Sequence, residues 1–345
     1  MSNFQIGLAA TGFVLLVCVF AYNSWTSRKN TPRQAEPGPA DAGAQAAMEP
    51  SFFDAEVQRQ NLSLALLAKK PALDGLIDVI AVLVLDPSAG PVSGEAAISA
   101  LPPTWRAGTK PFAVEGFNTP AQHWESPQPG QKYSAFQAGV QLANRTGALS
   151  EIEYSEFVVK TQAFADAIGA TPDFPEMRDE VARGRELDQF ASAHDAQLSL
   201  TLRARNASWS PGYVHQNAAR MGFIPGAMAG RMVLPASQEG MPPVLALVFD
   251  SQAAMADDPS QSAIREVSLY LDVPQSDRTE RPFERMRHAA FTMAESMDGV
   301  VTDDNGQPLA LETMDVIDAE LQALYNTLEQ RDLAAGCAVA RRLFS

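Results

Sequence analysis

Cysteine is scarce in this chain of 345 residues, which contains only Cys18 and Cys337. Two cysteines this far apart, one of them inside an apolar run, exclude a disulfide framework and a CxxC metal or redox motif. This usage is typical of a reducing compartment. The sequence therefore predicts that the folded part of the chain lies in the cytoplasm.

Basic residues are also few. The 26 lysines and arginines stand against 41 acidic residues, which gives a formal net charge of −15. Affinity for nucleic acid comes mostly from the neutralisation of phosphates by Lys and Arg, so this composition opposes a nucleic-acid partner. An RNA-binding sheet would also need paired aromatics beside basic groups. Strands such as EVSLYLDVP (266–274) do not supply them.

Signatures of catalysis and of metal binding are missing from the sequence. No GxSxG, Walker, GxGxxG or HExxH motif occurs. None of the four histidines has a second His or Cys at helical ligand spacing; they are His123, His194, His215 and His288. Residues 303–306 (DDNG) lack the spacing of a calcium loop and indicate a turn. We predict no enzymatic activity, no cofactor, no metal and no small-molecule substrate.

Charge is absent from the N-terminal run between Phe4 and Trp25. Its apolar core of about 20 residues is long enough, at about 1.5 Å per residue, to span a hydrocarbon layer of about 30 Å. Arg28, Lys29 and Arg33 follow the run, and no basic residue precedes it. By the positive-inside rule the N-terminus faces the periplasm and the rest stays in the cytoplasm. A cleaved signal peptide and a buried soluble helix are the alternatives.

Residues 28–71 are predicted to form a linker with one short helix. Residues 30–50 are rich in Pro, Ala and Gly without apolar periodicity, as in solvated linkers. Residues 54–70 (DAEVQRQNLSLALLAKK) show helical spacing of apolar residues and stop before Pro71.

The remaining residues, about 270, are enough for two ordinary domains. In the second stretch, strand patterns occur at 196–204, 227–234, 243–251 and 266–274, and helical patterns at 211–223, 282–297 and 311–328. The first stretch repeats this order less completely, from a strand at 76–85 to helices at 152–168 and 176–190. We predict an α+β fold of the split β-α-β type, an antiparallel sheet with helices on one face, present as two tandem related units.

The predicted organisation has five parts. They are a transmembrane anchor (1–27), the linker and short helix (28–71), a first α+β unit (72–192), a second α+β unit (193–332) and a C-terminal tail (333–345). The sheet face without helices is the natural docking surface for a peptide in such a layout.

Three pieces of the second unit carry a resemblance to a known family. They are ARMGFIPGAM (219–228), EVSLYLDVP (266–274) and MDGVVTDDNGQPLALETMDVIDAELQALY (297–325). They resemble the C-terminal domain of ZipA, the membrane anchor of the bacterial division ring that binds the C-terminal tail of FtsZ. The order of membrane helix, linker and C-terminal domain is similar as well. The resemblance also makes the first unit a divergent copy of the same domain.

The resemblance implies which residues bind the peptide, because the family's groove is formed by alternate side chains on the exposed sheet face. Carried over, these positions are Gln197, Ser199, Thr201, Met228, Gly230, Leu247, Phe249, Ser251 and Tyr270. The period of two along a strand puts each set on one face. Apolar strand residues are usually core, so Met228, Leu247, Phe249 and Tyr270 have packing under a helix as their alternative.

Two functions from different classes follow. In the first, the chain is an inner-membrane anchor at the division site whose second unit binds the FtsZ tail and tethers FtsZ polymers. In the second, it is a membrane-anchored scaffold whose α+β units bind another protein or each other, because many functions share this layout. Isothermal titration with the FtsZ tail peptide separates them.

Overall fold

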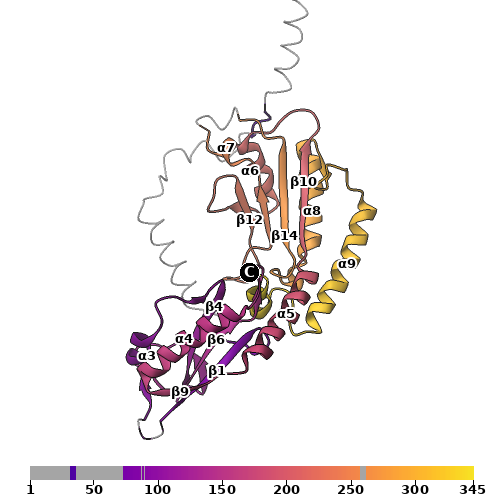
Figure 1. The fold of residues 1–345 in the computed structure, drawn as a ribbon. Helices are drawn as coiled ribbons and strands as arrows, with labels where there is room; N and C mark the ends of the chain where they lie inside the picture. The colour runs from indigo at the N-terminus through magenta and orange to yellow at the C-terminus, as the bar shows by residue number, and fades with distance from the viewer. Residues whose placement is uncertain (1–31, 36–72, 87, 89, 257–261) are drawn as a thin grey trace, which may run out of the picture. The chain divides into compact units, whose positions relative to one another are not determined.

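The structure, a computed structural model, describes residues 32–35, 73–86, 88, 90–256 and 262–345. The predicted membrane helix and the predicted helix at 54–70 lie outside these residues. None of the helices in the described ranges is long and apolar enough to cross a membrane. The chain forms two compact units. We call residues 73–195 with 326–345 the first domain, and residues 196–325 with 32–35 the second domain (Figure 1).

The first domain is built on an antiparallel sheet in the order β3-β4-β6-β1-β9. Its long strands are β1 (Asp78–Leu85), β4 (Lys110–Asn118), β6 (Lys132–Gln141) and β9 (Ala170–Asp173). Shorter strands are β2 (Val92–Ser93), β3 (Arg106–Ala107), β5 (His123–Glu125), β7 (Ala143–Asn144) and β8 (Gly147–Ala148). Its helices are α3 (Gly94–Ala100), α4 (Glu151–Ile168), α5 (Met177–His194) and α10 (Ala338–Leu343).

Helix α4 closes one face of this sheet. A capping box between Ser150 and Glu153 starts the helix, and Gly169, in the left-handed conformation, ends it. Its buried Phe157 and Phe164 meet Phe112 of β4 and Phe136 of β6, with ring centroids 6.2 and 5.5 Å apart. These aromatics form the core of the first domain.

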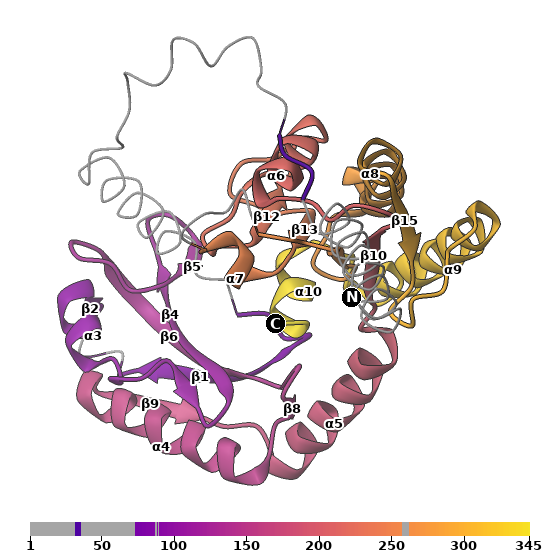
Figure 2. The same ribbon diagram turned by 90° about the horizontal axis from the view of Figure 1, so that it is seen from above.

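The prediction of a C-terminal tail at residues 333–345 was wrong, because these residues are part of the first domain. Helix α10 lies on the face of the sheet opposite to α4 (Figure 2). Leu343 and Phe344 are 1% exposed, and Arg342 donates two hydrogen bonds to the carboxylate of Asp78 in β1, at 2.6 and 2.8 Å. Burial outweighs the attraction of Arg342 and raises the pKa of Asp78.

We expect Arg342→Ala to lower the free energy of unfolding by about 3 kcal/mol, because it leaves the Asp78 carboxylate buried without its charge partner. Denaturant titration of the variant measures the loss. Arg185→Ala removes an exposed arginine of α5 and serves as the matched control. The double variant Asp78→Asn/Arg342→Met should regain part of the stability. A single variant as stable as the unmodified chain would show that α10 does not hold the domain together.

The second domain contains an antiparallel sheet in the order β11-β12-β13-β14-β10-β15. The strands are β10 (Gln197–Ala204), β11 (Ile224–Pro225), β12 (Arg231–Leu234), β13 (Leu245–Val248), β14 (Glu266–Asp272) and β15 (Gly299–Thr302). Its helices are α6 (Pro211–Arg220), α7 (Ser251–Ala254), the 3₁₀ turn η2 (Arg278–Glu280), α8 (Pro282–Met297) and α9 (Leu311–Glu329), which runs on into the first domain.

One face of this sheet is covered by α8, with α6 beside it (Figure 2). The methionines of α8 (Met286, Met293 and Met297) are at most 1% exposed and belong to the core. Trp209, fully buried, donates its indole N–H to the backbone oxygen of Met297 at 2.7 Å. The mixed α+β fold with antiparallel sheets is as predicted.

The described residues 32–35 are fastened to the second domain. Arg33 donates its backbone N–H to the oxygen of Ser208 at 2.7 Å and accepts from the N–H of Ser210 at 2.9 Å. Its guanidinium lies 3.0 Å from the carboxylate of Asp298. A residue that the sequence places in a free linker is therefore held by backbone and side-chain contacts.

Candidate functional site

The face of the second sheet that lies opposite to α8 and α6 is the candidate peptide-binding site, and we call it the open face. Strand pairing defines two rows of side chains that cross it. The first row is Ile224, Val233, Ala246, Tyr270 and Ser199; the second is Arg231, Val248, Ser268 and Thr201. Gln197 and Asp272 form a further pair beside the first row.

The phase of the sheet is set by β14. Its residues Val267, Leu269 and Leu271 are at most 1% exposed, while Tyr270 between them is 45% exposed. The alternation segregates polar from apolar groups, so only one face of β14 can be turned to the core. Tyr270, predicted as a binding residue, does lie on the open face.

The placement of Leu247 and Phe249 on this face was wrong. Leu247 pairs with the core residue Leu269 and is fully buried. Phe249 is 5% exposed, and its ring lies edge-on to His215 of α6 at 5.6 Å. Burial of its imidazole lowers the pKa of His215. Both residues are core because the register with β14, and not the sequence of β13, decides which side of β13 faces the helices.

The turn from β11 to β12 carries Met228 and Gly230. Met228 is 61% exposed. Gly230 has a φ of +74°, and a Cβ at this position would lie 2.6 Å from the backbone oxygen of Phe249, so the turn requires glycine. Gly230 is buried and shapes the turn without offering a contact. Ser251 is exposed, but it starts α7 and is not part of β13.

On β10, the predicted residues Gln197 and Ser199 are accessible, whereas Thr201 is only 7% exposed. The hydroxyls of Thr201 and Ser268 are 3.1 Å apart, and the hydroxyl of Thr302 donates to the backbone oxygen of Thr201 at 3.2 Å. These contacts occupy Thr201, which therefore marks the border of the open face.

Sequence reasoning missed five accessible residues of the open face, namely Ile224, Arg231, Val233, Ala246 and Val248. Ile224 is 50% exposed. Val233 and Ala246 lie in the row of Tyr270, and Arg231 and Val248 lie in the second row. The signal that finds them is the pairing of β13 with β14, since Ala246 opposes Tyr270 and Val248 opposes Ser268. A hollow of about 230 Å³ in this face is lined by Arg231, Ala246 and Tyr270, among others.

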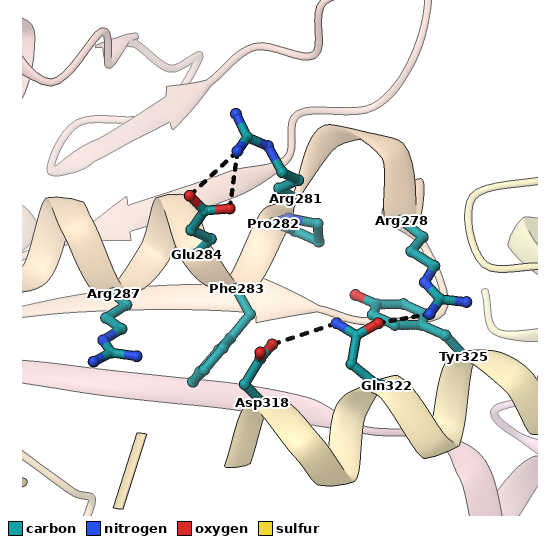
Figure 3. Close-up of a pocket in the computed structure, with 9 residues that line it drawn as sticks. All are labelled: Arg278, Arg281, Pro282, Phe283, Glu284, Arg287, Asp318, Gln322 and Tyr325. Carbon is teal, nitrogen blue, oxygen red and sulfur yellow. Dashed lines mark hydrogen bonds and ion pairs between the residues drawn. The ribbon is translucent and has the colours of Figure 1, made fainter. Parts of the chain in front are cut away.

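A second pocket, of about 320 Å³, lies between η2, α8 and α9 (Figure 3). The guanidinium of Arg278 lies over the ring of Tyr325 and donates to the side-chain oxygen of Gln322 at 2.7 Å. Burial raises the pKa of Tyr325 to about 12, so its hydroxyl stays neutral at physiological pH. Arg287 at the rim pairs with Asp315 of α9 at 2.6 Å. These contacts join α9 to η2 and α8.

Within the described ranges, no group of three or more His, Cys, Asp or Glu residues converges as a metal site would require. The accessible side chains in the two rows of the open face are apolar or polar and uncharged, apart from Arg231.

Comparison with known proteins bears on the same part of the chain. Residues 214–320 match the family model of ZipA, C-terminal FtsZ-binding domain. This confirms the resemblance. The match covers less than a third of the chain and includes the strands β11 to β15, but not β10. It indicates an FtsZ-binding cell-division protein, and the ZipA domain is a binding domain without catalysis. No curated protein matches the chain.

Proposed function

We propose that the second domain captures the C-terminal tail of FtsZ on the open face, and that residues 1–27 anchor the chain in the bacterial inner membrane. FtsZ polymers would then be tethered to the membrane at the division site. The observation that carries the proposal is the coincidence of the family match with an uncovered sheet face whose apolar groups surround Tyr270.

The geometry favours docking by side chains over strand addition. Tyr270 lies on β14, which has neighbours on both sides, so its backbone groups are already paired. A tail lying across the sheet would place apolar side chains against Val233, Ala246, Val248 and the flexible Met228. A tail that orders on binding has modest affinity at one site, and a polymer that presents many tails makes such sites sufficient.

Isothermal titration of the detergent-solubilised full chain with the FtsZ tail peptide tests the proposal. We expect saturable binding that is lost when Tyr270 and Val248 are both replaced by Asp. Unchanged heats for the peptide and for a scrambled peptide would contradict it. The fragment 190–345 is unsuitable, because residues 326–345 belong to the first domain.

We infer that the two domains are copies of one unit, as their connectivity supports. The sheet order β4-β6-β1-β9 of the first repeats the order β13-β14-β10-β15 of the second. Helices α3, α4 and α5 occur at the same points along the chain as α6, α8 and α9. Strand β12 has no counterpart of similar length in the first domain.

The corresponding face of the first domain differs in ways that oppose the same ligand. Glu115, 5% exposed, takes the place of an apolar residue there and accepts hydrogen bonds from the N–H of Leu73 at 3.0 Å and from Gln137 at 2.8 Å. The side chain of Leu73 lies over Gly139, so the start of the domain already occupies part of this face.

We expect one tail peptide to bind per chain. Titration should give a stoichiometry near one, and Tyr270→Asp should remove all measurable binding, because the first domain does not bind the same peptide. Val82→Asp, which changes the face of the first domain, is the matched control and should bind normally. Two peptides per chain, or full residual binding in Tyr270→Asp, would contradict this prediction.

The scaffold function keeps one observation in its favour. Val82 and Val84 of β1 are 46% and 58% exposed, and Trp124 packs edge-on to Phe117 nearby on the same face. Exposed apolar groups on one sheet face are typical of a protein contact. A scaffold would bind a different partner here, or a second copy of the chain, and loss of that contact in Val82→Asp would leave FtsZ binding intact.

A further inference from the structure

Arg231 is a cation of the open face. It is exposed, starts β12 and pairs across the sheet with Val248. In the part of the chain that the structure describes, its guanidinium makes no hydrogen bond or ion pair. Arg203, farther along the same sheet, has Glu266 at 3.3 Å. Arg231 is therefore available to a ligand, whereas Arg203 is engaged.

The surroundings of Arg231 favour a carboxylate next to an apolar group. The same hollow is lined by Arg231, by Tyr270, which is 45% exposed, and by Ala246. Asp272 also lines the hollow and has an interaction of its own. A guanidinium presents a planar set of donors that matches a carboxylate, and an aromatic surface at its side lowers the local dielectric constant.

The charge of the chain strengthens the inference. With a formal net charge of −15, the protein as a whole repels acidic segments. Arg231, an arginine among apolar side chains, then gives this part of the open face a local preference for a carboxylate. Such a charge affects the association rate and the register of a ligand more than its total affinity.

We infer that the open face selects a peptide segment in which a carboxylate adjoins an apolar side chain, and that Arg231 is the residue that determines this specificity. The inference rests on the proposed function, since it names the chemistry of the segment that the same face would take. It predicts that the segment of the FtsZ tail that lies at β12 contains an Asp or Glu next to an apolar residue.

The test is a double-mutant cycle on the full chain in detergent. Arg231→Gln is expected to weaken binding of the FtsZ tail peptide about two- to fivefold, the range for an exposed ion pair, and to make the affinity less dependent on salt. The carboxylates of the peptide are changed one at a time to amides. One of these changes should weaken binding to the unmodified chain and have no effect on Arg231→Gln.

Arg220→Gln is the matched control, because Arg220 is an exposed arginine at the end of α6, in the helical layer, and its removal changes the net charge equally. Equal affinity and equal salt dependence of Arg231→Gln and the unmodified chain would overturn this inference alone. The inference would also be overturned if every carboxylate-to-amide change in the peptide weakened binding to Arg231→Gln as much as binding to the unmodified chain. Absence of any binding by the unmodified chain would instead overturn the proposed function, and this inference with it.

Discussion

Tyr270→Ala should weaken binding of the FtsZ tail by about 1 to 3 kcal/mol and leave the thermal midpoint nearly unchanged. The side chain is 45% exposed on the open face, between Ser199 of β10 and Ala246 of β13. An exposed aromatic at the centre of a docking surface contributes contact area to the ligand and little to the fold. Isothermal titration and a thermal melt of the same sample separate the two effects.

Phe249→Ala provides the contrasting result, because this ring belongs to the core. It is 5% exposed and packs against His215 of α6, so truncation should cost about 3 to 5 kcal/mol of folding stability. The fraction that stays folded should bind the tail with normal affinity. The assignment of faces would be wrong if Phe249→Ala melted normally and bound weakly, or if Tyr270→Ala unfolded.

This pair of residues also shows how far the sequence determines the site. In β14, polar and apolar residues alternate strictly, and the face of Tyr270 follows from the sequence without a structure. In β13, Ala246 and Val248 alternate with Leu245 and Leu247, and both sets are apolar. When both sets of alternating residues in a strand are apolar, the sequence of the strand does not show which set faces the core. The pairing of β13 with β14 decides this, and a pattern within β13 alone does not contain that information.

The place of the C-terminal residues in the first domain is a second feature that local sequence patterns do not predict. Residues 338–343 are too short for a helical pattern to be recognised, and Arg342 pairs with Asp78, 264 positions earlier. A sequence pattern predicts the element types of both domains because they rest on local periodicity. It does not predict which domain includes the last 20 residues, since that depends on a contact between residues far apart in the sequence.

Deletion of residues 1–27 should move the protein entirely from the membrane fraction to the soluble fraction without unfolding either domain. The deleted segment contains the run from Phe4 to Trp25, which carries no charge and is long enough to span a bilayer. Fractionation of cell lysates and a thermal melt of the purified protein measure the two effects. A variant in which an unrelated apolar run of equal length replaces residues 4–25 is the control and should return to the membrane.

The position of Arg33 limits how far the second domain can lie from the predicted membrane segment. Because Arg33 is bound to Ser208, Ser210 and Asp298, the second domain begins eight residues after Trp25, a span of at most about 28 Å when extended. The anchor would therefore hold the part of the second domain around Arg33 within about 28 Å of the bilayer. The deletion ends before Arg33 and keeps its contacts, so the truncated chain should still bind the tail peptide. Persistent sedimentation of the truncated chain with membranes would refute the anchor.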